Sequence, residues 1–277
     1  MSTIQIAVPA PRAPRVRPLG PLATLAQRRF QLTARNPREL LVPLLTPIMF
    51  ALVIAPSLKT ALHTGSAYES YVAIGTVGLL IPLNTMFSGL GVIVDRVSGA
   101  QRELLTAPIP RALLVLGNLL VALAITALQV GVLIAVAVAR GIHFDTSATR
   151  AAWFAGAAVL FTVGMYGIAE ILAARVPRQE EYIARVPAIA ILPWFLAGAL
   201  FPITALPNVL MWVAKFLPLT HALAVMRYGL RGDSTGLHAI WHMSNATAMA
   251  GLSLAVIAAF AVLLTAGSIR VFSHSRP

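Results

Sequence analysis

Long apolar segments dominate the chain and alternate with short charged or proline-rich ones. A bilayer core of about 30 Å requires about 20 apolar residues per helix, so segments of that length are candidate membrane spans. Six segments qualify, at roughly residues 40–58, 71–94, 113–139, 152–174, 186–200 and 246–267, the fifth being short. The pattern therefore predicts an all-α polytopic membrane protein with six transmembrane helices.

An amphipathic pattern precedes the first predicted span. Apolar residues recur there at helical spacing, with arginines between them: Leu22, Leu25, Ala26 and Phe30, with Arg28, Arg29 and Arg35. This predicts a helix lying in the inner membrane interface. A simple extension of the first span is the alternative, which Asn36-Pro37 disfavours by interrupting a continuous helix. Residues 1–20 are rich in Pro and Arg and are predicted to form a flexible cytoplasmic arm, leaving 21–277 as a single transmembrane domain.

The segment between the fifth and sixth predicted spans, residues 201–242, is too apolar for an ordinary loop. Pro202, Pro207 and Pro218 divide it into pieces too short to cross a bilayer. We predict re-entrant helices on the outer side, buried against the rest of the protein. A seventh span broken by proline is the alternative, and it would move the C-terminus outside, against the charge distribution.

Composition supports a membrane protein, and charge orients it. Of the 277 residues, 58% are hydrophobic and 11% are charged, the mean hydropathy is +0.82, and cysteine is absent. With six spans, 15 of the 21 Lys and Arg residues fall on the side of the termini and 6 on the other. The positive-inside rule then predicts that both termini are cytoplasmic. We expect a multi-pass protein of the plasma membrane (the bacterial inner membrane). The net charge of +12 does not predict nucleic-acid binding, because the charges flank apolar segments and form no continuous basic face.

The stretch DRVSGAQRELLTAPIPR, residues 95–111, is the longest hydrophilic segment in the interior of the chain. Its middle favours a short helix, with Gly99 before it and Pro108 after it. Its charges are mixed in sign, and Leu104 and Leu105 give it an apolar ridge, which suits a groove on a partner protein. A solvated loop that merely follows the positive-inside bias explains the pattern equally well.

Two motifs in this order resemble those of a known family. The first is an acidic-Arg pair, a Gly, Arg-Glu-Leu-Leu, Ala-Pro and Pro-Arg: Asp95, Arg96, Gly99, Arg102, Glu103, Leu104, Leu105, Ala107, Pro108, Pro110 and Arg111. The second follows the fifth predicted span: Phe201, Pro202, Leu206, Pro207, Pro218, Leu219, Thr220 and Arg227. The chain resembles the permease subunit of type-2 ABC exporters, most closely the daunorubicin-resistance drug-exporter group. It departs from that pattern at Val97-Ser98 and at His221.

The resemblance implies that residues 95–111 form a coupling helix in a groove of a separate ABC ATPase. The chain contains no G-x-x-x-x-G-K-[ST] motif, so we expect nucleotide chemistry to come from that partner. The chain is therefore not expected to be an enzyme by itself. The implied assembly has two ATPase subunits, which bind ATP and Mg, and two permease chains in a homodimer or heterodimer surrounded by membrane lipid. No cofactor is expected in this chain. The second predicted cytoplasmic loop contributes Arg175, Arg178 and Arg185.

The implied function is outward transport of a hydrophobic or amphiphilic substrate: a drug, a lipid or a secreted metabolite. Export of lipid-linked glycan or polysaccharide is the alternative within this class. An ATP-independent carrier or channel is the alternative from another class, and it is disfavoured because the sequence shows no internal repeat. A membrane scaffold without transport is a third, weaker possibility.

Several polar and Met residues are candidates for other roles. A substrate pathway is predicted along the first and second spans, with ordinary helix packing as an equal alternative: Thr46, Met49, Phe50, Asn84, Thr85, Met86 and Phe87. Glu170, about one turn inside the fourth span, is expected to pair inside the protein or at the ATPase interface, or else to reach the headgroups. His238 and His242 have metal-ligand spacing but no third ligand, so no metal site is predicted.

Overall fold

The computed structural model describes residues 19–35, 41, 44–45, 48–61, 63, 66–106 and 110–274. Within these ranges every regular element is a helix and no strand occurs. The all-α prediction is therefore confirmed. Of the predicted arm only residues 19 and 20 are described, and Thr46, Ala107 and Pro108 lie outside the described residues.

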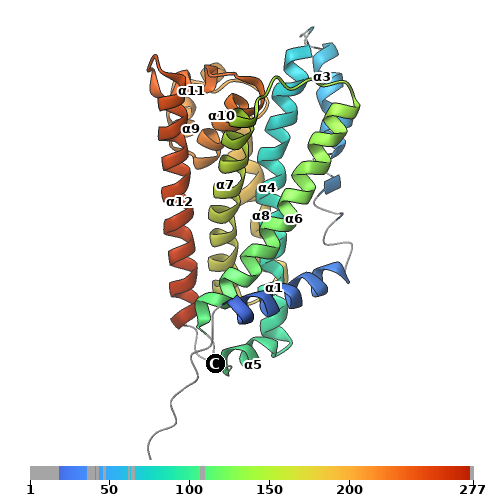
Figure 1. Ribbon diagram of the computed structural model, residues 1–277, viewed down its shortest axis with the longest axis vertical. Helices are drawn as coiled ribbons and strands as arrows, with labels where there is room; N and C mark the ends of the chain where they lie inside the picture. Colours follow the sequence, from blue (N-terminus) through green and yellow to red (C-terminus); the bar gives the residue numbers. More distant parts are fainter. Residues whose placement is uncertain are drawn as a thin grey trace, which may run out of the picture.

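Four long helices lie side by side and make up the body of the molecule (Figure 1). They are α4 (Ser66–Val97), α6 (Arg111–Ala139), α7 (Ala148–Arg175) and α12 (Ala246–His274). Each is long and apolar enough to cross a bilayer, because at 1.5 Å per residue a helix of about 20 residues already covers 30 Å. They correspond to the predicted second, third, fourth and sixth spans.

The first and fifth predicted spans have a less regular outcome. The described part of the first is η1 (Phe50–Ile54), a π-helical turn, followed by α3 (Ala55–Ala61). The fifth falls in α8 (Gln179–Leu196), which has only 18 residues and carries Glu180, Glu181 and Arg185. By length and composition the described residues contain four candidate spans, or five if α9 (Asn208–Phe216) and α10 (Pro218–Arg231) are counted as one bent span.

Short helices gather at the two ends of the long ones. At one end, α1 (Leu19–Ala34) and α5 (Ala100–Thr106) lie across the bundle (Figure 1). At the opposite end lie η2 (Ile203–Ala205), α9, α10 and α11 (Thr235–Trp241). We refer to these as the α5 end and the α10 end. The axes of α9 and α10 differ by 80°, and α10 begins at Pro218, where the fixed φ of proline suits a first helical turn.

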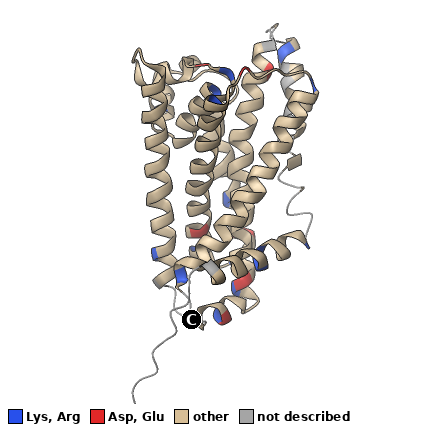
Figure 2. Cartoon of the chain, viewed as in Figure 1, with Lys and Arg blue, Asp and Glu red and all other residues tan. Residues whose placement is uncertain are grey.

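Small residues allow the helices to approach closely at the centre of the bundle. A Cβ on Gly167 of α7 would lie 2.7 Å from the backbone of Leu264 on α12, and a Cβ on Gly75 would overlap the Ala199 carbonyl. Close backbone approach of this kind is typical of helices packed within a membrane. Figure 2 shows the charged residues gathered mainly towards the two ends, with most of each long helix uncharged.

Candidate functional site: the α4–α5 corner

The corner between α4 and α5 begins with an acidic residue bound to the amphipathic helix. Asp95 Oδ1 accepts from Arg28 Nη2 of α1 at 3.0 Å, and Asp95 Oδ2 lies 3.8 Å from Arg29 Nη1. The Asp95 side chain is mostly buried. Its negative charge therefore fixes α1 against the end of α4 and is not presented to solvent.

The guanidinium group of Arg29 lies in a space on the surface of α4 that Gly91 leaves open. The Arg29 side chain is buried, and Nη2 donates to the carbonyl of Ser88 at 3.0 Å. A Cβ on Gly91 would overlap the guanidinium group, so only glycine leaves the space that Arg29 occupies. The sequence shows the basic residues of α1 but not this dependence on a residue in the second predicted span.

Arg96 joins α4 to the end of α7. Its Nη1 donates to the carbonyl of Ala173 at 2.9 Å, and its Nη2 donates to that of Val176 at 2.6 Å. Carbonyls in the last turn of a helix lack intrahelical partners, and a cation there also interacts favourably with the helix dipole. The first loop at the α5 end is thus connected to the loop that follows α7.

Gly99 makes the turn between α4 and α5. Its φ is +81°, in the left-handed region that favours glycine. The Gly99 amide donates to the carbonyl of Arg96 at 3.2 Å, and its own carbonyl accepts from Arg102 N at 3.0 Å, in the first turn of α5. The predicted helix is present, and α5 contains the sequence AQRELLT.

The two faces of α5 differ in what they contact. Leu104 and Leu105 are half-buried and pack against an apolar cluster that includes Leu25 of α1 and Leu114 of α6. Arg102 and Glu103 are exposed. The apolar ridge predicted from the sequence therefore anchors α5 to its own chain, and the exposed charged pair is the part of α5 left to meet a partner.

The remaining arginines of the two predicted loops differ in their contacts. Arg111, at the start of α6, donates to the carbonyl of Ser273 near the end of α12 at 2.5 Å. Arg178 is exposed and lies 3.8 Å from Glu181, and Arg175 and Arg185 are also exposed. Arg175, Arg178 and Arg185 are thus exposed positive groups in and around the second predicted loop.

Glu170 of α7 is buried within the protein and does not extend to the surface. It is 2% exposed, accepts a hydrogen bond from the Tyr166 hydroxyl one turn earlier, and is hydrogen-bonded by the Asn118 side chain of α6. Arg29 and Asp95 interact with it electrostatically. The buried carboxylate is thus part of a network of polar side chains that extends from the Asp95 corner into the bundle.

The described polar residues of the predicted pathway form hydrogen bonds within the chain. Asn84 donates to the Thr126 hydroxyl of α6, and the Thr85 hydroxyl donates to the carbonyl of Ile81 at 2.9 Å. Met86 is fully buried and Phe87 partly so, whereas Met49 is half exposed; the Phe50 side chain is not among those described. Their role in transport stays a prediction.

The second motif supplies the starts of the short helices at the α10 end. Pro202 directly precedes η2, Pro207 directly precedes α9, and Pro218 is the first residue of α10. Phe201 is exposed, and Thr220 and Arg227 are buried. Proline ends one helix and favours the start of the next, which is the physical reason for three prolines in a region that changes direction repeatedly.

No cluster of three or more potential metal ligands occurs among the described residues. The α4–α5 corner is fixed by internal salt bridges and a capped helix end, and its exposed charged pair is suited to contact with a protein. Together with the apolar helices they define a multi-pass membrane protein with an anchored surface helix.

Comparison with known proteins identifies the family. The sequence profile of the family described as ABC-2 type transporter matches residues 21–230, which include the α4–α5 corner and the second motif. This chain belongs to that family, as a type-2 ABC permease. It is also 24% identical over 214 residues to a protein of Porphyra purpurea named "Putative transport permease ycf38", covering 75% of this chain and 72% of that protein.

Proposed function

We propose that the chain is the membrane subunit of an ATP-driven exporter, and that α5 docks on a separate ABC ATPase. The observation that carries this proposal is the exposed Arg102–Glu103 pair on a helix whose other face is fixed to α1 and α6. A helix fixed in this way transmits movement of its partner to the chain, since α4 continues directly into the corner. Family membership supports the same role.

The mixed charge of the surface favours a protein partner over lipid. A loop bound to anionic lipid gains about 1 kcal/mol for each Lys or Arg near the surface, and an acidic residue works against that gain. Glu103 is exposed at the tip of this corner. Complementary charges on an ATPase groove make use of both signs.

The proposed complex contains two copies of this chain, or this chain and a related one, with two ATPase subunits that bind ATP and Mg. The proposed substrate is hydrophobic or amphiphilic and moves outward, as the resemblance to the daunorubicin-resistance group implies. The α5 end is then cytoplasmic, and the α10 end faces outward. Export of a lipid-linked glycan by the same machinery is the second candidate.

The dependence on a partner is tested by purifying the chain alone and together with its ATPase. ATP hydrolysis is expected from the complex and not from the chain alone, and transport into inverted vesicles is expected only when both are present. Hydrolysis by the chain alone above background, or ATP-independent transport at the same rate, contradicts the proposal.

A further inference from the structure

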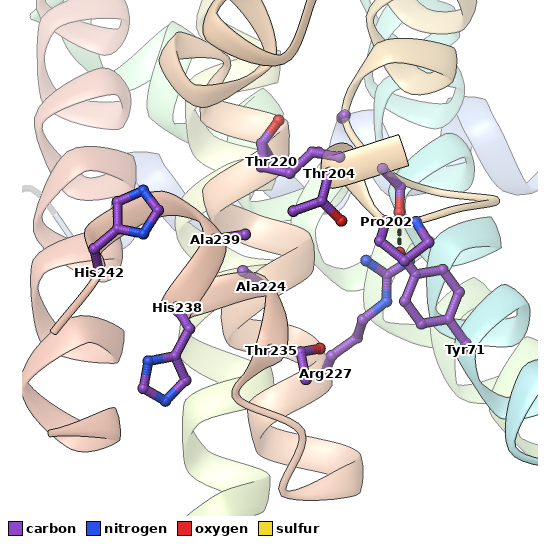
Figure 3. A pocket seen from close by; sticks show the side chains of 14 residues that line it. Tyr71, Pro202, Thr204, Thr220, Ala224, Arg227, Thr235, His238, Ala239 and His242 are labelled. Carbon is purple, nitrogen blue, oxygen red and sulfur yellow. Dashed lines mark hydrogen bonds between the residues drawn. The ribbon is translucent and has the colours of Figure 1, made fainter. Parts of the chain in front are cut away.

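A cavity of about 510 Å³ lies at the α10 end, between α10, α11 and the segment around η2 (Figure 3). Thr220, Ala224 and Arg227 line it from one face of α10, at a spacing of four and three residues. His238 of α11 and His242, which directly follows α11, also line it, and Pro202 and Ile203 give it an apolar wall. Its volume falls in the range of small-molecule sites.

Arg227 provides a buried positive charge at this cavity. It is 5% exposed, Nη2 donates to the carbonyl of Ala199 at 3.0 Å, and the guanidinium carbon lies 3.5 Å from the centroid of the Tyr71 ring. The Tyr71 hydroxyl in turn donates to the Gly198 carbonyl at 2.8 Å. These contacts fix the plane of the guanidinium group, yet its Nε, also buried, has no hydrogen-bond partner.

Thr220 carries a second orphaned polar atom. Its hydroxyl oxygen is buried without a partner, although the side chain lines the same cavity in the first turn of α10. A buried hydroxyl or N–H without a partner costs about 1–3 kcal/mol, so an acceptor on a ligand would stabilise either of these atoms. The N-terminal turn of a helix also favours a negative group.

The charge around the cavity is not balanced within the described part of the chain. Asp233, which follows α10, lies 3.5 Å from Arg231 and attracts Arg227 electrostatically, but no carboxylate among the described residues lies within 4 Å of Arg227. Lys215 adds a further positive charge 3.1 Å from the cavity residue His242. A buried charge without a counterion in direct contact is expensive, and a bound anionic ligand would lower that cost.

We propose that this cavity binds the oxyanion group of an amphiphile, a phosphate or a carboxylate, with Arg227 and Thr220 as donors to it and the wall of Pro202 and Ile203 against its apolar part. A free inorganic anion leaves most of a 510 Å³ space unused. An anionic lipid and a transported anionic amphiphile share the required chemistry.

Native mass spectrometry of the full chain in an uncharged detergent tests the proposal. The probes are dihexanoyl phosphatidylglycerol, dihexanoyl phosphatidylcholine, octanoate and inorganic phosphate. The phosphatidylglycerol and octanoate are expected to bind in preference to phosphatidylcholine, which has the same chains without net charge. Preference for phosphatidylglycerol identifies a lipid headgroup as the source, and preference for octanoate identifies a transported anionic amphiphile. Preference for inorganic phosphate over both contradicts the proposal that the ligand is an amphiphile.

Thr220→Val and Arg227→Lys are the informative variants, with Thr106→Val at the other end of the molecule as the matched control. Since the Thr220 hydroxyl has no partner, Thr220→Val is expected to leave the Tm unchanged or raise it, yet to weaken binding of the preferred anion about tenfold. Arg227→Lys keeps the charge and removes the planar donor group, so binding is expected to fall as well. Absence of binding to the wild-type chain, or wild-type affinity in both variants with intact folding, overturns the proposal.

Discussion

Arg96 of α4 reaches the end of α7, where its Nη2 donates to the Val176 carbonyl at 2.6 Å. The two residues of the acidic-Arg pair therefore bind different helices: Asp95 forms a salt bridge with α1, and Arg96 donates hydrogen bonds to the end of α7. Both residues fix the corner from which α5 projects. In this arrangement the motif stabilises the platform, and the exposed residues of α5 are left for recognition.

We expect Arg96→Ala to destabilise the purified chain, because the carbonyls of Ala173 and Val176 lose a charged donor worth about 1.5–3 kcal/mol. The Tm in detergent should fall by several degrees. Arg102→Ala, which removes an exposed arginine from the same corner, should leave the Tm nearly unchanged. Equal Tm values for the two variants would show that Arg96 does not cap α7.

We expect Gly91→Ala to displace Arg29 and loosen α1, because the added methyl group overlaps the guanidinium. The chain has no cysteine, so introduced cysteines can report on the position of α1 through a short cross-linker. Suitable positions are Leu25 of α1 and Gly117 of α6, because a Cβ added at residue 117 would lie 3.0 Å from the Leu25 Cβ.

Cross-linking between these cysteines should fall in the Gly91→Ala background. It should persist with Gly131→Ala, the matched control, since a Cβ at residue 131 meets nothing within 4 Å. Undiminished cross-linking with Gly91→Ala would mean that Arg29 does not depend on that space.

Asp233 gives a pH-dependent contribution to stability. Burial raises the pKa of its carboxyl, but hydrogen bonds from Thr235 and the positive charge of Arg231 outweigh burial and leave the pKa below its usual 3.8. A lowered folded-state pKa contributes stability above the unfolded pKa, and that contribution is lost as the pH falls through the folded pKa.

The wild-type chain should therefore have a higher Tm than Asp233→Asn at pH 7. The difference should shrink as the pH falls below about 4. Asp145→Asn, in which the replaced carboxylate is largely exposed, should show a smaller difference at every pH. A wild-type advantage that grows on acidification would reverse the assigned sign.

The orientation of the protein is open to direct labelling. A cysteine at Ser244, exposed between α11 and α12, should react with an impermeant maleimide added to intact cells. A cysteine at Ser273, near the end of α12, should react only after the cells are opened. The reverse pattern would contradict both the charge-based orientation and the outward placement of the α10 end.

Much of the fold follows from periodicity and from proline and glycine. The apolar lengths predicted α4, α6, α7 and α12, and the alternation of Leu and Arg predicted a helix at α1. Gly99 marked the turn before α5 for a local reason, its positive φ. Such features depend on residues that are close in sequence, so they can be predicted from the sequence alone.

The contacts that build the corner could not be predicted from the sequence, because they join segments that are far apart along the chain. Nothing near Arg96 indicates that it caps α7, about 80 residues later, and nothing near Gly91 indicates a buried arginine of α1. The apolar ridge of Leu104 and Leu105 was predicted to suit a groove on a partner, with a solvated loop as the alternative. The structure instead packs both residues against a cluster of the same chain, which local sequence does not indicate. The prediction of six spans also depended on the first and fifth apolar segments. The described part of the first segment is shorter than a span, and α8, which contains most of the fifth, is short and carries charged residues.

The central claim is that the exposed charges of α5 dock on the ATPase. Its most direct test is co-purification of the ATPase with Glu103→Lys, which changes an exposed side chain and leaves the packed face of α5 intact. Asp145→Lys, an equal charge reversal on an exposed residue outside the corner, is the matched control.

We predict that Glu103→Lys inserts normally, retains the wild-type Tm and loses the ATPase, with affinity lowered by about two decades if the pair is desolvated in the groove. Asp145→Lys should retain the ATPase at the wild-type level. ATPase recovered equally with both variants and with the wild-type chain, and unchanged efflux in cells, would contradict the account.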